Sequence, residues 1–357
     1  MKKNAKVLSM ILAGAMALSL AGCSSSGSKE GAEETMVKSE ETAAGEAGAE
    51  TSKAPEAGAA DAAGETYQIG VIQLVQHDAL DAANKGFFAA LDEAGIDYEA
   101  DQQNASGEQA NCMTIAEKLV NDGSDLILAI ATPAAQAVAG VTDEIPVLLT
   151  AVTDPAESGL VNDNEKPGVN VSGTSDLTPV KEQIDLLQQL LPEAKKIGLL
   201  YCSAESNSQL QIAMAEEACK AAGLSYEEYT VPSSNEIQSV VESMVGKVDA
   251  IYAPTDNVIA AGMSTVAMVA TDNKIPVICG EAGMVNAGGL ATYGIDYYQL
   301  GYMTGEQAIE VLTKGADVAE MPIGYLPAER CALTVNKTTA DALGIDISGL
   351  EGAEIVE

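Results

Sequence analysis

The sequence predicts an α/β protein whose folded part consists of two similar lobes, each built around a parallel sheet. Short continuous apolar runs, typical of strands inside parallel sheets, alternate with segments that have helical spacing. This alternation implies right-handed crossovers with helices on both faces of each sheet. Residues 125–147 also resemble residues 249–277, because in both a buried strand ends in threonine, a helix follows, and an Ile-Pro-Val strand comes next. A chance likeness between two βα units is the alternative, but the echo favours two equivalent lobes.

The elements follow from apolar runs and from capping residues. Asp78 is expected to cap the first helix and Gly95 to end it, while Pro133 opens the third helix at its first turn, where a missing N–H costs nothing. The expected strands, in order, are residues 67–74, 96–100, 125–131, 145–152, 196–202, 225–231, 249–253 and 276–280. The expected helices, in order, are residues 78–94, 107–121, a segment from 133, then 179–191, 206–222, 236–245 and a long helix 256–271.

The N-terminus has the pattern of an export signal. Three lysines precede an apolar stretch, residues 7–20, which is too short for a comfortable membrane span. The next residues, Leu20-Ala21-Gly22-Cys23, match a bacterial lipobox. We therefore expect a signal peptide at residues 1–22 and a Cys23 that carries diacylglycerol and palmitate. An ordinary signal peptide followed by a chance cysteine is the alternative.

Residues 23–66 are expected to form a disordered acidic linker. After Cys23 they contain no aromatic residue, and three lysines stand against nine glutamates and Asp61. Such a composition cannot bury enough apolar surface to offset the entropy of ordering. We expect the folded part to be lipid-anchored on the extracytoplasmic face of the cell membrane, held at a distance by this segment.

Composition and missing motifs exclude several classes of function. The net charge of −35 argues against nucleic acid, whose phosphates require basic patches. The single histidine, His77, rules out a His-rich metal site and disfavours a Ser-His-Asp hydrolase. No G-x-S-x-G, Walker or G-x-G-x-x-G motif is present, so we expect neither an enzyme nor a cofactor. Five cysteines follow Cys23 without a C-x-x-C spacing, and buried free thiols are the default.

Ligands of open parallel sheets lie beyond the carboxyl ends of the strands, which yields a short set of candidate residues. The helix start at Thr132, Ala134 and Ala135 offers N–H groups for a carboxylate, although a simple cap with close packing explains it equally well. Asp256 offers a counter-charge for an ammonium, and a helix N-cap is its alternative role. The other candidates at strand ends are His77, Thr153, Ser206, Asn207, Ser208 and Glu281.

Seven stretches together resemble the substrate-binding lipoproteins of ABC importers, and more narrowly the family with tryptophan- and tyrosine-binding components. They spread across nearly the whole folded part: IGVIQLVQHDALD (69–81), ATPAAQ (131–136), LTAVTDP (149–155), NVSGTSD (170–176), YCSAESNS (201–208), PTDN (254–257) and GIDYYQLGYMTG (294–305). The resemblance implies the type I periplasmic-binding-protein fold, with two Rossmann-like lobes joined by three crossings. The implied crossings lie at residues 170–176, 291–296 and 325–330.

The resemblance also implies lobe boundaries and site roles. The N-terminal lobe would comprise residues 67–175 plus 297–326, and the C-terminal lobe residues 176–296 plus 327–357. The implied ligands of an amino acid carboxylate are Thr132, Ala134, Ala135, Thr153 and Thr174. The implied partners of its ammonium are Asp256, Glu281 and Asp296, with Tyr297 as a wall.

The leading hypothesis is an extracytoplasmic, monomeric binding protein. It captures a small amino acid, aromatic in nature, in a cleft between the lobes and delivers it to the transmembrane subunits of an ABC permease. The alternatives are the same fold binding a sugar, a nucleoside or a peptide signal, a surface adhesin or sensor, and an epimerase- or racemase-like enzyme. No catalytic residue and no metal ligand is assigned.

Overall fold

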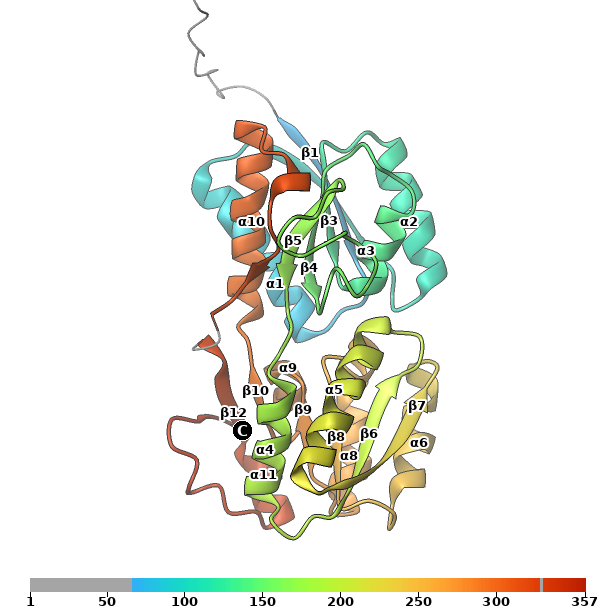
Figure 1. Cartoon of the computed structure of the whole chain (residues 1–357), viewed down its shortest axis with the longest axis vertical. Helices are drawn as coiled ribbons and strands as arrows, with labels where there is room; N and C mark the ends of the chain where they lie inside the picture. Colours follow the sequence, from blue (N-terminus) through green and yellow to red (C-terminus); the bar gives the residue numbers. More distant parts are fainter. Residues whose placement is uncertain (1–65, 328–329) are drawn as a thin grey trace, which may run out of the picture. The chain divides into compact units, whose positions relative to one another are not determined.

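The computed structural model describes residues 66–327 and 330–357 (Figure 1). The expected signal peptide, the lipobox with Cys23 and the linker up to residue 65 lie outside the described residues. The folded part alternates strands and helices around two separate sheets, as the apolar pattern predicts.

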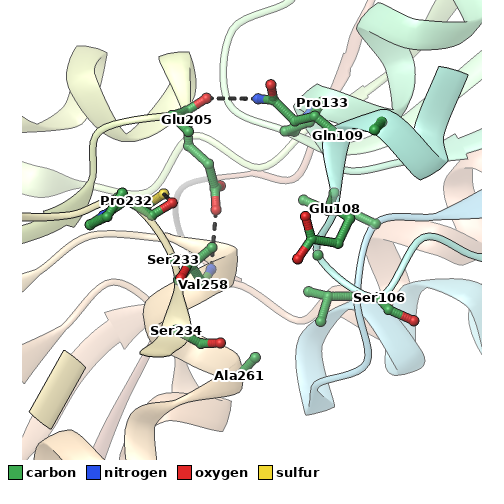
Figure 2. Close-up of a pocket in the computed structure, with 16 residues that line it drawn as sticks. Ser106, Glu108, Gln109, Pro133, Glu205, Pro232, Ser233, Ser234, Val258 and Ala261 are labelled. Atoms are coloured by element: carbon green, nitrogen blue, oxygen red, sulfur yellow. Dashed lines mark hydrogen bonds between the residues drawn. The ribbon is translucent and has the colours of Figure 1, made fainter. Parts of the chain in front are cut away.

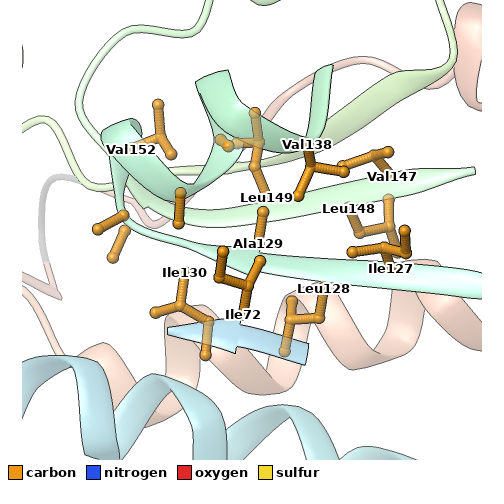
Figure 3. Close-up of a cluster of buried hydrophobic side chains, with 14 of the residues drawn as sticks. Ile72, Ile127, Leu128, Ala129, Ile130, Val138, Val147, Leu148, Leu149 and Val152 are labelled. Atoms are coloured by element: carbon orange, nitrogen blue, oxygen red, sulfur yellow. The ribbon is translucent and has the colours of Figure 1, made fainter. Parts of the chain in front are cut away.

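The first sheet has six parallel strands in the order β11-β5-β4-β3-β1-β2. These strands are β1 (Tyr67–Gln73), β2 (Tyr98–Asn104), β3 (Leu126–Ile130), β4 (Val147–Val152), β5 (Val171–Ser175) and β11 (Gly324–Tyr325). The first lobe's main helices are α1 (Asp78–Ala94), α2 (Gln109–Asn121), α3 (Thr132–Ala139) and α10 (Tyr297–Lys314). Helices α1 and α10 cover one face of this sheet and α3 the other (Figures 1 and 3).

The core of the first lobe lies on both faces of β3 and β4. Every residue of these two strands is buried, and Figure 3 shows Leu128, Ile130 and Leu149 among the side chains that pack around them. Burying each such side chain contributes about 1.5–3 kcal/mol. A strand that buries both faces needs the continuous apolar run that the sequence provides.

Glycines bring α1 and α10 into close contact. A Cβ atom at Gly301 would collide with the carbonyl oxygen of Ala83, and one at Gly86 with that of Tyr298. The long helix that follows the second crossing is thereby fixed to the first helix of the chain. Residues more than 200 positions apart in sequence therefore build one lobe.

The second sheet has seven strands in the order β13-β12-β10-β9-β8-β6-β7, all parallel except that β10 and β12 are antiparallel. These strands are β6 (Lys196–Cys202), β7 (Ser225–Val231), β8 (Ala250–Ala253), β9 (Val277–Cys279), β10 (Ala291–Gly294), β12 (Ala332–Asn336) and β13 (Glu354–Val356). The associated helices are α4 (Val180–Leu190), α5 (Ser206–Ala222), α6 (Ile237–Met244), α7 (Asn257–Ala261), α8 (Met263–Asp272), α9 (Ala282–Asn286) and α11 (Lys337–Leu343). Single 3₁₀ turns lie at Ser234–Glu236 and Val318–Glu320.

The chain passes between the two sheets three times. It leaves the first sheet after β5, returns from β10 into α10, and leaves again between β11 and β12. These passages give the type I periplasmic-binding fold, with two Rossmann-like lobes. The lobe boundaries stated above stay predictions. Much of the first two expected crossings is strand, because residues 171–175 form β5 and residues 291–294 form β10.

Two expected elements differ from the observed ones. The expected helix 256–271 is split into α7 and α8 at Gly262, where a Cβ atom would collide with Ile237. A strand expected at residues 96–100 runs instead from Tyr98 to Asn104, since its pairing with β1 continues through polar residues. The default of buried free thiols is confirmed for Cys112, Cys202, Cys219 and Cys279, whereas Cys331 is only partly buried.

Candidate functional site

The carboxyl ends of strands from the two sheets meet at a shared crevice. The Gln211 amide donates a 3.2 Å hydrogen bond to Thr153 Oγ1, and the Gln109 amide donates a 2.9 Å bond to the Ala204 carbonyl. In each pair the two residues belong to different lobes. The loops after β4 and β6 therefore approach the opposite lobe at this crevice.

The beginning of α3 leaves several hydrogen-bond donors unused. Neither the N–H of Thr132 nor that of Ala134 donates to a described backbone carbonyl, whereas the N–H of Ala135 donates to Ala131. Ala131 itself adopts a φ of +83°, a strained conformation for a residue with a side chain. The hydroxyl of Thr132, 1% exposed, has no hydrogen-bond partner among the described residues. Free N–H groups, the helix dipole and this hydroxyl all favour a carboxylate here.

Ala134 and Ala135, both at the start of α3, differ in whether their backbone N–H is available. Both side chains are fully buried and no larger than a methyl group, so they do not block a close approach to the start of the helix. Because the Ala135 N–H is already used, the expectation that it faces a ligand is not supported by the hydrogen-bond pattern. Ala134 keeps its N–H available.

The two other threonines of the first lobe play different parts. Thr153 takes part in the bond that crosses the crevice to Gln211. Thr174 instead places its hydroxyl 3.0 Å from Thr150 and 2.8 Å from Thr304, inside the first lobe. Its hydroxyl is thus satisfied by protein, which argues against its predicted contact with a ligand carboxylate.

Asp176 follows β5 directly and is the acidic group best placed for a cation. Its Oδ2 accepts a 2.7 Å hydrogen bond from the Tyr297 hydroxyl, while its buried Oδ1 has no partner among the described residues. Burial raises the pKa of Asp176 to about 6, although the hydrogen bond from Tyr297 opposes that rise. Tyr297, predicted as a wall, is accordingly buried and holds this carboxylate. The sequence reasoning missed Asp176, although it ends the NVSGTSD stretch immediately after a buried strand.

Asp256 is already satisfied within its own lobe. Its Oδ1 caps α7 through the N–H of Ile259 at 2.8 Å, and its Oδ2 accepts from the Cys202 N–H at 2.6 Å and from Ser208 at 2.7 Å. The N-cap alternative is therefore correct. Both of its oxygens are thus engaged within the second lobe, which argues against the ammonium contact that the sequence suggested. Ser208 is likewise committed to this carboxylate.

Glu205 adds a second buried carboxyl beside Asp256. It accepts hydrogen bonds from the Asn257 side chain at 2.5 Å, from the Val258 N–H at 3.1 Å and from the Asn207 side chain at 3.2 Å. Burial, followed by repulsion from Asp256, raises the pKa of Glu205 to about 8. It occupies the N-cap position of α5 without capping that helix through its side chain. Its buried role could not be predicted, because glutamates before helices are usually solvated.

Asn207 offers a second bare acceptor. Its amide nitrogen is directed to Glu205 and to the Thr255 carbonyl at 3.3 Å, which leaves the buried Oδ1 without a described partner. Its neighbour Ser206 is exposed, and its hydroxyl lies 3.4 Å from the Gln136 amide of the other lobe. Of these two candidates, Asn207 has the group that a buried ligand would need.

His77 joins the lobes from the loop before α1. Its Nε2 lies 3.3 Å from Asn257 Oδ1, and since the Asn257 nitrogen donates to Glu205, the histidine must donate here. Its Nδ1 is buried without a described partner, so it is a further acceptor. Burial lowers the pKa of His77, which favours the neutral ring. Thr255 and Asn257, which the sequence also places at a strand end, lie at the crevice together with Gln211. Gln211 was not anticipated, because a polar residue inside a helix looks like an ordinary surface residue.

Glu281 and Asp296 are both helix caps, but they differ in burial. Glu281 is buried and accepts from the N–H groups of Gly283 and Met284, and burial raises its pKa to about 7. Its charge interacts with that of Asp176. Asp296 is exposed and caps α10 through the Gln299 N–H at 3.1 Å. Its predicted contact with a buried ammonium therefore has no support in the structure.

A cavity of about 280 Å³ opens between the lobes beside this crevice (Figure 2). The first lobe contributes Glu108 and Pro133 to its walls, and the second lobe Glu205, Ser233 and Val258. Across residues 66–327 and 330–357, acidic, cysteine and histidine side chains nowhere gather in threes to hold a metal ion. Within the same ranges, every helix is too short or too polar to cross a bilayer.

Comparison with known proteins agrees with this architecture. Residues 68–350 match the family described as ABC transporter substrate binding protein. A tyrosine-binding protein of Clostridioides difficile (strain R20291) is 40% identical over 349 residues, covering 96% of this chain and 93% of that protein.

Two solved structures extend the comparison. An ABC domain from Streptococcus pneumoniae in complex with L-Trp has a TM-score of 0.79 at 41% identity, covering 82% of this chain and all of that one. The ligand-free, open structure of a Clostridium difficile substrate-binding protein with adhesive properties has a TM-score of 0.63 at 42% identity, covering 82% of this chain and 99% of that one. With a matching family over most of its folded part, the chain belongs to the substrate-binding proteins of ABC transporters.

Proposed function

We propose that this protein captures a free α-amino acid with an aromatic side chain between its lobes and delivers it to an ABC permease. The observation that carries the proposal is a set of buried polar atoms without described partners on both sides of the crevice. Two of them are acceptors, Asp176 Oδ1 and Asn207 Oδ1. The hydroxyl of Thr132 and the free N–H groups at the start of α3 are instead hydrogen-bond donors.

An ammonium group suits the two acceptors. Buried polar atoms are nearly always hydrogen-bonded, so atoms left bare in a binding protein point to a ligand that satisfies them. An ammonium has three donors and one positive charge. Asp176 supplies the compensating charge, and no lysine or arginine is buried among the described residues to compete for it.

A carboxylate suits the start of α3. Its two oxygens match the N–H groups of Thr132 and Ala134 and the Thr132 hydroxyl, and the helix dipole adds to the attraction. A zwitterion seated in this way is paired at both ends, which a buried charge requires.

The aromatic class is supported by the relatives. Those at 40% and 41% identity are described as tyrosine-binding and as a complex with L-Trp. Similarity to the L-Trp complex, at TM-score 0.79, exceeds that to the open structure, at 0.63, although the identities are nearly equal. This difference and the hydrogen bonds between the lobes support a closed arrangement, which ligand would stabilise by bridging the lobes.

We further infer that the protein is a monomer held by diacylglycerol on Cys23 at the extracytoplasmic face, and that it releases its solute unchanged. The lipobox and the acidic composition after it support the anchor. Labelling of the expressed protein with radioactive palmitate, lost in Cys23→Ala, tests this part separately.

Calorimetric titration with each of the twenty amino acids tests the ligand. We expect micromolar or tighter binding of tyrosine or tryptophan. The chain contains no tryptophan, so the fluorescence of added tryptophan reports its own binding. If none of the twenty binds at micromolar concentration, the proposed function is wrong.

A second function, adhesion, is favoured by the description of one 42% identical relative as having adhesive properties. Adhesion and transport are compatible, because the outer faces of the lobes are not used by the crevice. Comparing attachment of coated beads to host cells with and without saturating ligand would reveal it. Attachment no greater than that of beads coated with an unrelated acidic protein would exclude adhesion.

A further inference from the structure

The cavity of about 280 Å³ has walls unlike those of the crevice beside it. Its apolar lining comes from both lobes, with Leu74, Val75 and Pro133 on one side and Pro232 and Val258 on the other. Apolar surface of this kind accepts a hydrocarbon or aromatic group rather than a charged one. An interlobe hydrogen bond from Gln109 to Ala204 borders it, so the cavity exists only when the lobes are together.

Glu108 is an acidic group of this cavity without a described partner for its side chain. It occupies the N-cap position of α2, yet its side chain makes no capping hydrogen bond. Among the described residues no cationic side chain pairs with it. Figure 2 shows its carboxyl group directed toward the second lobe, across the cavity. An acceptor in this position is available to a donor on whatever occupies the cavity.

Residues of the cavity wall adjoin residues of the proposed zwitterion site, through a hydrogen bond on one lobe and in sequence on the other. Glu205 lines the cavity and also binds Asn207, whose bare Oδ1 belongs to the crevice. On the first lobe, Pro133 of the cavity wall stands between Thr132 and Ala134 of the carboxylate seat. The cavity wall and the proposed zwitterion site thus share neighbouring residues on both lobes.

We propose that the cavity receives the side chain of the bound amino acid, and that Glu108 selects aromatic side chains carrying a hydrogen-bond donor at their far end. The phenol hydroxyl and the indole N–H are such donors. This proposal rests on the proposed function and deepens it by assigning the side-chain subsite. Acidic side chains are disfavoured, because the Glu108 carboxylate would repel them.

Paired ligands that differ only in the donor test the proposal. Calorimetry compares tyrosine with phenylalanine, and tryptophan with 3-benzothienylalanine, in which sulfur replaces the indole N–H. We expect the donor-bearing member of at least one pair to bind about tenfold more tightly to the unmodified protein, as for a hydrogen bond to a charged acceptor.

Three variants locate the effect. Glu108→Ala should reduce that preference about tenfold and Glu108→Gln should retain part of it, because its amide oxygen still accepts. Glu117→Gln, which changes the same charge on an exposed position of the same helix, should leave the preference unchanged. Glu108 is exposed and makes no described side-chain hydrogen bond, so the alanine variant should fold.

The outcomes separate this inference from the proposed function. An equal preference in Glu108→Ala and the unmodified protein would overturn the inference while aromatic amino acid binding stands. The inference would also be overturned if the unmodified protein bound both members of each ligand pair with equal affinity. Failure of every amino acid to bind the unmodified protein would overturn the proposed function itself, and the inference with it.

Discussion

The hydroxyl of Tyr297 donates a 2.7 Å hydrogen bond to Oδ2 of Asp176, across 121 positions of the sequence. Asp176 follows the last residue of β5 and Tyr297 is the first residue of α10, so the bond joins two of the three passages between the lobes. The oxygen that Tyr297 leaves bare is the one we assign to the ligand ammonium. Ligand binding and the geometry of the hinge are therefore connected through one carboxylate.

Asp176→Asn should weaken amino acid binding at pH 7.5 by about 30-fold or more, because truncating one partner of a buried charge pair costs about 2–5 kcal/mol. In the unmodified protein, affinity should fall as the pH decreases through about 6. The pKa of Asp176 is raised to about 6, and its protonated form cannot pair with an ammonium. Titrations between pH 5 and 8 measure both effects.

Tyr297→Phe is the matched control for that profile. The tyrosine hydroxyl lowers the pKa of Asp176, so its removal should move the fall in affinity to higher pH. Asp176→Asn should instead abolish the fall near pH 6. An unchanged profile in both variants would show that Asp176 does not meet the ligand.

Thr132→Val and Thr174→Val should have opposite consequences. The Thr132 hydroxyl is buried without a partner, so valine should raise the free energy of unfolding of the ligand-free protein by about 1 kcal/mol while weakening binding about tenfold. The Thr174 hydroxyl bonds to Thr150 and Thr304, so valine there should destabilise the protein and leave affinity unchanged. Denaturant unfolding and calorimetry give the two quantities. A destabilised Thr132→Val with normal affinity would place that hydroxyl in the protein's own structure.

The ligand-free protein should become more stable as the pH falls from 8 to about 5. Burial raises the pKa of Glu205 to about 8, that of Glu281 to about 7 and that of Asp176 to about 6. In this range the folded state binds more protons than the unfolded state, so the free energy of unfolding rises as pH decreases. His77 acts in the opposite direction because burial lowers its pKa, but it is one group against three.

Thermal unfolding of the ligand-free protein at pH 8 and pH 5.5 checks this dependence. We expect a rise of about 1 kcal/mol or more, since one pKa unit corresponds to about 1.4 kcal/mol. Glu205→Gln should flatten the dependence. A melting temperature that is lower at pH 5.5 than at pH 8 would contradict the prediction.

Gly301→Ala should destabilise the first lobe by about 1–3 kcal/mol or more, as overpacking does. The added Cβ would meet the backbone of Ala83 in α1, which cannot move aside as a flexible side chain can. Gly349→Ala is the control, because nothing lies within 4 Å of a Cβ at that position. Equal unfolding midpoints for the two variants would mean that α1 and α10 are not packed in this way.

Most of the fold could be predicted because apolar periodicity and capping are local signals. The strands β6 and β7 and the helix α5 were predicted with the bounds that the structure shows. The break at Gly262 could not be predicted, since it depends on Ile237 from a neighbouring helix.

The site was predicted less completely, because the sequence places a residue at a strand end without showing what its side chain contacts. Asp256 and Asp176 both follow buried strands, yet local N–H groups satisfy the first while the second keeps a bare oxygen. Thr174 and Thr132 differ in the same way, through hydroxyl partners that are distant in the sequence. The roles of Glu205 and Asn257 appear only once β6 and β8 lie in one sheet.

The claim on which the account depends is that both ends of a zwitterion are bound, the carboxylate by the start of α3 and the ammonium by Asp176 and Asn207. The most direct measurement is calorimetric titration of tyrosine and tryptophan against tyramine and tryptamine, which lack the carboxylate, and against the matching arylpropionic acids, which lack the ammonium. We expect both kinds of analogue to bind at least about 100-fold more weakly than the parent amino acid, since each leaves buried charge or polar groups unpaired. An amine or an acid that binds as tightly as its parent would contradict the account.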